Sequence, residues 1–184
     1  MNNNIIFLLF IVFSLNQKVI MSQSFIYDFN NQSNLSNWII VNDDVMGGLS
    51  SCQMRIDDQG NGVFEGFIST ENNGGFSSIR LNLERVKVSN NAYFKIKLKG
   101  DNKKYQLRIK TNRSDYQSYV ASFQTSSEWE IIKISLNDMY PSFRGRKLNM
   151  KNFSDDYFQQ ISFLVGNKKN ERFKLLIDSI ELIN

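Results

Sequence analysis

Strict alternation of apolar and polar side chains in two stretches, residues 94–99 and 105–110, is the feature that most limits how this chain can fold. The sequence reads FKIKLK from 94 to 99 and YQLRIK from 105 to 110. Successive side chains of a β-strand point to opposite faces of a sheet, so a period of two predicts two strands, each with one buried face. An amphipathic helix would need a period near 3.6, which neither stretch has.

The tetrapeptide between these stretches, Gly100-Asp101-Asn102-Lys103, is rich in residues that tolerate the positive φ of a tight turn. We therefore expect the two strands to pair as a hairpin. That pairing would align five basic side chains on one outer face, namely Lys95, Lys97, Lys99, Arg108 and Lys110. We interpret this stripe as a solvated face that resists aggregation, with a docking surface for an acidic partner as the alternative.

Strand-like runs recur along the rest of the chain, separated by turn residues, and no long amphipathic helix is evident. They are expected at residues 25–29, 38–42, 51–57, 63–68, 76–81, 92–99, 105–111, 119–124, 129–136, 161–165 and 173–183. Many short strands at this spacing are typical of a sandwich or a barrel. A length of 184 residues, of which 41% are hydrophobic, allows one domain with a substantial core, which we place at residues 25–184.

One long segment, residues 137–160, interrupts the succession of strands. It contains the single proline, Pro141, followed by Phe143-Arg144-Gly145-Arg146. Ser154-Asp155-Asp156 has the pattern of an N-cap and an acidic first turn, and predicts one short helix. A connection this long in a compact domain is often functional.

The N-terminal residues 1–24 are expected to form a leader. Ile5 to Phe13 is an unbroken apolar run, as long as the core of a signal peptide and too short for a stable membrane span. The first arginine is Arg55, which excludes an Arg-rich mitochondrial transit peptide, and Met21 is an alternative start. We expect export to the cell envelope if the leader is a signal peptide, and a cytoplasmic protein otherwise.

Composition excludes several classes of function. The chain has no histidine, which removes Ser-His-Asp and Cys-His nucleophiles and histidine-based metal sites. Its single cysteine, Cys52, alternates with Met54 and Ile56, so we interpret it as a buried apolar residue, with a reactive thiol as the alternative. The net charge of +4 is spread along the chain, which argues against a nucleic-acid partner. We expect no enzyme activity, no cofactor and no metal.

Two polar loops, each with a Gly-Gly pair, are the most unusual local sequences. They read NDDVMGGLS at residues 42–50 and STENNGGFSSIR at residues 69–80. Both follow predicted strands, so they could form one concave rim at an end of the sandwich, or serve only as structural turns. Their carboxylates Asp43, Asp44 and Glu71 could act as a glycosidase pair or bind calcium, but their spacing in the sequence establishes neither. Neither loop has the spacing of a phosphate-binding loop.

Several of these blocks in order resemble the complex I intermediate-associated protein 30 family. They are Trp38 with NDDVMGGLS, then GVFEGFISTENNGGFSSIR, KGDNKKYQLRIK and PSFRGR, within a resemblance over about residues 25–183. The resemblance implies an all-β, galactose-binding-like jelly roll of two antiparallel sheets. It also implies a chaperone-like, non-enzymatic assembly factor for NADH:ubiquinone oxidoreductase. The apolar leader differs from the import sequence of mitochondrial members, which suggests another compartment.

The candidate site is a binding rim with no catalytic residue, and another protein is the expected partner. It comprises Asn42, Asp43, Asp44, Met46, Gly47, Gly48, Ser50, Glu71, Gly74, Gly75, Phe76, Arg80, Arg144 and Arg146. The alternative is a carbohydrate-binding module of the cell envelope. Its aromatic platforms would come from Tyr93, Tyr116, Tyr119 and Tyr140.

Overall fold

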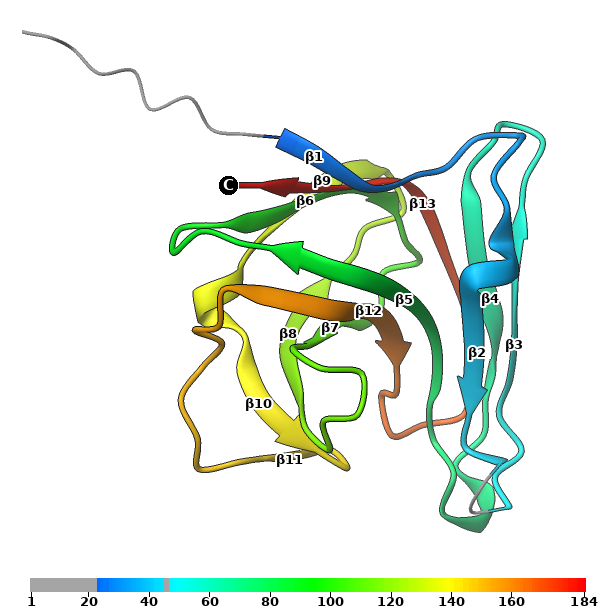
Figure 1. The fold of residues 1–184 in the computed structure, drawn as a ribbon. Coiled ribbons are helices and arrows are strands. Elements are labelled where there is room, and N and C mark those ends of the chain that lie inside the picture. Colours follow the sequence, from blue (N-terminus) through cyan, green and yellow to red (C-terminus); the bar gives the residue numbers. More distant parts are fainter. Residues whose placement is uncertain (1–22, 45–46) are drawn as a thin grey trace, which may run out of the picture.

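The protein is a sandwich of two antiparallel β-sheets, seen in a computed structural model that describes residues 23–44 and 47–184 (Figure 1). Most of the expected leader, and Met46 of the expected rim, lie outside the described residues. The described residues contain no α-helix but several short 3₁₀ turns, including those at Leu35–Asn37, Glu71–Asn73 and Leu136–Asp138. The predicted all-β, jelly-roll class is therefore confirmed.

The strands divide into a six-stranded and a seven-stranded sheet. The first has the order β3 (Ser51–Ile56), β4 (Gly62–Ile68), β13 (Glu171–Ile183), β6 (Tyr93–Lys99) and β9 (Trp129–Ser135), with β1 (Gln23–Asp28) also paired to β13. The second has the order β11 (Arg146–Lys147), β10 (Tyr140–Phe143), β8 (Ser118–Gln124), β7 (Lys104–Lys110), β12 (Tyr157–Val165), β5 (Ser77–Lys87) and β2 (Trp38–Asn42).

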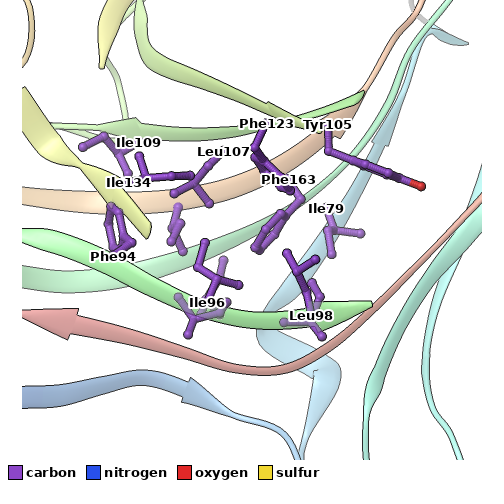
Figure 2. Close-up of a cluster of buried hydrophobic side chains, with 14 of the residues drawn as sticks. Ile79, Phe94, Ile96, Leu98, Tyr105, Leu107, Ile109, Phe123, Ile134 and Phe163 are labelled. Carbon is purple, nitrogen blue, oxygen red and sulfur yellow. The ribbon is translucent and has the colours of Figure 1, made fainter. Parts of the chain in front are cut away.

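The core lies between the two sheets, and the alternating stretches supply its centre. Phe94, Ile96 and Leu98 of β6 are fully buried and lie across the core from β7 (Figure 2). The facing residues of β7 are Tyr105, Leu107 and Ile109, buried just as completely. Burying such a side chain contributes about 1.5–3 kcal/mol relative to leaving it exposed. The predicted inward faces of both stretches are confirmed.

The predicted hairpin between these two strands is wrong. β6 pairs with β13 and β9, whereas β7 pairs with β12 and β8, so residues 100–103 cross from one sheet to the other. Asn102 does adopt a positive φ of 62°. Turn residues specify that the chain reverses, but not whether the next strand stays in the same sheet. The expected basic stripe is therefore split between the outer faces of two different sheets.

The predicted helix after Ser154 is also wrong, because Tyr157 begins strand β12. The two acidic residues anchor neighbouring strand ends instead. Thr111 Oγ1 donates to the Asp155 carboxylate, and the backbone N–H of Val88 donates to the carbonyl of Asp156 at 2.9 Å. The register with β5 shifts between Phe158 and Gln160, an irregularity that breaks the period-two pattern and hides the first half of this strand in the sequence.

Candidate functional site

The two Gly-Gly loops lie together at one end of the sandwich. Residues 43–50 join β2 to β3 and residues 69–76 join β4 to β5, so both cross between the same two sheets (Figure 1). A third loop, residues 166–170, joins β12 to β13 at the same end. The backbone N–H and Oγ1 of Thr70 donate to Asn170 Oδ1 at 2.7 and 2.9 Å. We call these three loops the rim.

Asp43 holds the rim together from the inside. Its carboxylate is only 2% exposed and accepts hydrogen bonds from the backbone N–H and the hydroxyl of Ser50, at 3.1 and 2.5 Å. It also accepts from the backbone N–H groups of Gly75 and Phe76, at 2.6 and 3.3 Å. Burial by itself would raise the pKa of Asp43, but the hydrogen bonds from Ser50, Gly75 and Phe76 together lower it. The ionised carboxylate thus ties two loops that lie some thirty positions apart.

In each Gly-Gly pair, one glycine is required because a side chain would collide with Asp43, and the other is required because its backbone adopts a positive φ. A Cβ on Gly48 would lie 2.2 Å from Asp43 Oδ1, and a Cβ on Gly74 would lie 2.6 Å from Asp43 Oδ2. The partner glycines, Gly47 and Gly75, adopt φ values of +76° and +133°, which side chains rarely permit. The unusual sequence of both loops is therefore explained by packing around one carboxylate.

This arrangement limits the chemistry that the rim can perform. The oxygens of Asp43 are saturated by N–H and O–H donors and shielded from solvent, so they are unavailable to a substrate or a cation. Asp44 and Glu71 are exposed at the surface. In the part of the chain that the structure describes, no group of three or more acidic or cysteine side chains is placed to hold a metal ion.

Other predicted rim residues also have structural contacts. Asn42 Oδ1 accepts a hydrogen bond from Cys52 Sγ at 3.2 Å, and Ser50 Oγ accepts one from the backbone N–H of Ser69 at 3.0 Å. Burial raises the pKa of the Cys52 thiol to about 11, so the half-buried thiol stays protonated at neutral pH. These contacts favour the interpretation of Cys52 as a packing residue.

The predicted arginines do not gather at the rim. Arg80 lies on the outer face of the seven-stranded sheet, directly opposite Ser162 of β12. Arg144 and Arg146 belong to the exposed β10–β11 turn. That turn is four strands away from β5, about 19 Å at about 4.8 Å per strand. It also lies beside the start of β8, near where β12 begins, whereas the rim lies where β12 ends.

The four tyrosines considered for a glycan platform are dispersed. Tyr119 is buried against Phe153, and Tyr93 lies on the outer face of the six-stranded sheet near Lys133. Tyr140 lies on the outer face of the other sheet near Lys147, and Tyr116 projects from the β7–β8 loop. They do not form one flat surface for a sugar chain.

Exposed apolar side chains beside the rim were missed from the sequence. Ile39 and Ile40 of the edge strand β2 are 45% and 42% exposed, and Leu49 in the rim is 56% exposed. The stretch from 38 to 42 reads WIIVN, an unbroken apolar run that looks like a buried strand. Only its position at a sheet edge, which the sequence does not reveal, leaves two of these side chains in solvent.

A hollow of about 710 Å³ lies on the outer side of the six-stranded sheet. The hollow is lined by two carboxylates, Glu65 and Asp101, and both already form ion pairs with basic side chains of the protein. Glu65 pairs with Arg55 and Lys174, at 2.9 and 3.4 Å, and Asp101 pairs with Lys103 at 2.7 Å. Each acid that lines the hollow is therefore neutralised by a basic neighbour, so neither is an unpaired carboxylate available to a ligand.

Sequence comparison agrees with this fold and with the position of the loops. The profile of a family described as complex I intermediate-associated protein 30 matches residues 27–177, which include both Gly-Gly loops and the β10–β11 turn. The chain belongs to this family. A comparison with curated protein sequences finds no match. The resemblance inferred from the sequence blocks is confirmed by the family match.

Solved structures that resemble this member of the complex I intermediate-associated protein 30 family include carbohydrate-binding modules. One is a family 11 module from Clostridium thermocellum in complex with a β-1,3-1,4-mixed-linked tetrasaccharide. It is 18% identical, with a TM-score of 0.63 over 87% of this chain and 94% of the module. Another is a family 29 module from Piromyces equi, 14% identical, with a TM-score of 0.54 over 90% and 91% of the two chains. At these identities the likeness shows the sandwich fold alone.

No helix among the described residues has the length and apolar character needed to cross a membrane.

Proposed function

We propose that this chain is a non-catalytic binding domain that acts as an assembly factor for NADH:ubiquinone oxidoreductase through contact with another protein. The observation that carries the proposal is the exposure of apolar side chains in the rim and on the adjoining edge strand: Leu49 is 56% exposed, and Ile39 and Ile40, on opposite faces of β2, are 45% and 42% exposed. Apolar side chains on a fixed surface, bordered by polar residues, are typical of a protein-binding site. Membership of the complex I intermediate-associated protein 30 family supports the choice of partner.

The rim is suited to this role because it is braced before any partner arrives. Four hydrogen bonds to Asp43 fix the two Gly-Gly loops, and Asn72 Nδ2 adds a bond to the carbonyl of Gly47 at 3.0 Å. A partner then binds without the entropy loss of ordering a flexible loop. Exposed Asp44 and Glu71 add charges that select a partner more than they strengthen its binding.

A carbohydrate-binding role is the second candidate, because a solved structure of similar fold is a carbohydrate-binding module in complex with a tetrasaccharide. The dispersal of Tyr93, Tyr116, Tyr119 and Tyr140 favours a protein partner over a glycan. Sugar recognition depends on aromatic rings that lie close enough to stack on successive sugar units.

The test is capture of defined subunits by the tagged full chain from solubilised membranes that contain NADH:ubiquinone oxidoreductase and its assembly intermediates. Mass spectrometry should identify subunits of this enzyme with the wild-type chain. Leu49→Glu places a charge in the apolar contact and should reduce their recovery at least tenfold. Ile131→Glu is the matched control, because Ile131 is 53% exposed on the outer face of the six-stranded sheet.

Each outcome has a separate meaning. Failure of the folded wild-type chain to recover any subunit contradicts the assembly role. Equal losses with Leu49→Glu and Ile131→Glu contradict the position of the contact. Selective binding of one glycan on an array, without recovery of subunits, supports the carbohydrate-binding candidate instead.

A further inference from the structure

Three basic side chains share the outer face of the seven-stranded sheet. Arg80 of β5 and Arg108 of β7 both lie opposite Ser162 of β12, so they flank this serine on the same face. Two strand spacings separate the two arginines, about 10 Å between their Cα atoms. Lys110 is two residues beyond Arg108 and lies opposite Gln160. The sheet thus places three cations around two polar side chains of β12, Ser162 and Gln160.

These three cations have no acidic partner among the residues that the structure describes. Arg80 Nε donates to Ser78 Oγ at 3.3 Å, and Arg108 donates from Nε and Nη2 to Gln106 Oε1 at 2.9 and 2.6 Å. Lys110 Nζ donates to the backbone carbonyl of Asp115 at 2.5 Å. All these acceptors are neutral.

On the six-stranded sheet, by contrast, two outward basic side chains have acidic partners. On the outer face of the six-stranded sheet, Lys95 pairs with Glu181 at 3.2 Å and Lys97 pairs with Asp178 at 3.1 Å. Lys95 and Lys97 are thus balanced by neighbouring acids, whereas Lys99, Lys133 and Arg172 on the same face form no ion pair with a described residue. The group of Arg80, Arg108 and Lys110 is not balanced in this way, so its charge is available to a ligand.

The three cations also repel one another. Burial lowers the pKa of Arg80, and burial together with the charge of Arg80 lowers the pKa of Arg108 and of Lys110. Tyr140 partly offsets this effect at Arg108, and Asp115 partly offsets it at Lys110. A guanidinium stays charged at neutral pH even so. Half-buried like charges are a destabilising arrangement that a bound anion would relieve.

We propose that this face is an oxyanion-binding site in which Arg80 and Arg108 hold a phosphate or sulfate group above Ser162. The planar guanidinium presents five N–H donors, and its fork matches the spacing of two oxygens of such a group. The existing bonds to Ser78 and Gln106 leave donors free on both arginines. The Ser162 hydroxyl supplies a further donor, and Lys110 adds a third charge, which favours a dianion over a single carboxylate.

This site lies on the sheet face and not in the rim loops, with Ile39 of β2 directly opposite Arg80. The binding of an anion there does not depend on the role proposed above. Its test is titration calorimetry of the full chain with inorganic phosphate, sulfate and glucose 6-phosphate, at constant ionic strength set with chloride. All three should bind to one site. Tighter binding of glucose 6-phosphate than of inorganic phosphate would indicate that the natural anion is carried by a larger ligand, and the reverse order would indicate a free anion.

The double variant Arg80→Gln/Arg108→Gln should weaken binding at least tenfold, because it removes both forks. Arg80→Lys/Arg108→Lys keeps the charge and loses only the fork, so it should bind more weakly than wild type and more tightly than the double glutamine variant. Its intact fold, checked by circular dichroism, separates lost binding from lost structure. Arg172→Gln, which removes one exposed positive charge from the outer face of the six-stranded sheet, is the control, and it should bind like wild type.

Three results would overturn the proposal. The first is absence of heat with all three anions at millimolar concentration. The second is an equal loss of affinity in Arg172→Gln, which would mean that only net charge matters. The third is binding of acetate as tight as that of sulfate, which would contradict the preference for a dianion.

Discussion

At the scale of single residues, Asp43 explains more of the sequence than any other side chain. It is buried, it accepts four hydrogen bonds, and it requires glycine at two positions in two different loops. The Gly-Gly pairs mark both loops in the sequence and suggest that the loops meet. Which of the three nearby carboxylates is buried is not visible in the sequence, because burial depends on the crossing of both loops between the sheets.

Replacing Asp43 should destabilise the fold and change its response to acid. Asp43→Asn places an NH₂ group where donors converge and leaves buried donors without an acceptor, which should lower the free energy of unfolding by about 1–3 kcal/mol. The pKa of Asp43 is lowered from its ordinary value of 3.8, so its contribution is fully present above that value and is lost as the pH falls below it. Urea unfolding between pH 7 and pH 3 measures both effects.

The control for this prediction is Asp44→Asn, a change in the exposed neighbouring carboxylate. It should leave stability at neutral pH within about 0.5 kcal/mol of wild type. If the two variants lost the same stability, or if Asp43→Asn kept the full acid sensitivity of the wild-type protein, the bracing role of Asp43 would be wrong.

At the scale of elements, the positions of the strands could be predicted from the sequence better than the partners with which each strand pairs. The alternation around Ile96 and Leu107 gave two inward faces correctly, because the period of two reports directly on burial. The partners of each strand were not predictable, since the tetrapeptide that follows β6 could close a hairpin or cross to the other sheet. The first half of β12 was hidden by its irregular register, and β10 by its proline.

The crossing between β6 and β7 should be sensitive to one glycine and tolerant at the next positions. A Cβ on Gly100 would lie 2.1 Å from Thr125 Oγ1, so Gly100→Ala should destabilise the protein by about 1–3 kcal/mol through overpacking. Asn102→Gly relieves a positive φ of 62° in the same loop and should change stability by less than about 1 kcal/mol. Thermal unfolding of both variants compares them directly, and equal destabilisation would contradict the packing argument.

At the scale of the whole molecule, the sandwich architecture could be predicted from the sequence pattern, whereas the positions of the candidate sites could not. Regular alternation, turn residues and the family blocks together predict a jelly-roll sandwich, and the structure has this fold. The rim was predicted in part, since the structure brings the two Gly-Gly loops together but places Arg144 at the far edge of a sheet. The cations at Arg80 and Arg108 come from strands far apart in the chain, so only strand order could bring them together.

Cys52 should report on unfolding of the entire sandwich. Burial raises the pKa of its thiol from the ordinary value of 9.0 to about 11, so the thiolate needed for reaction is on the order of 100-fold scarcer in the folded protein. Labelling by iodoacetamide at pH 7.4 should therefore be at least about 100-fold slower in buffer than in 8 M urea. Mass spectrometry gives both rates, and comparable rates would mean that the thiol is reactive in the native state.

The position of β13 has a consequence for how the protein is made. This strand comes last along the chain, yet it lies at the centre of its sheet, between β6 on one side and β4 and β1 on the other. While residues 171–183 are still being translated, β4 of the β3–β4 pair and β6 of the β6–β9 pair each have an unpaired edge, because their partner β13 is not yet available. Open edges of this kind attract other chains. The six-stranded sheet therefore cannot close before residues 171–183 have left the ribosome, and until then these edges stay open to pairing with other chains.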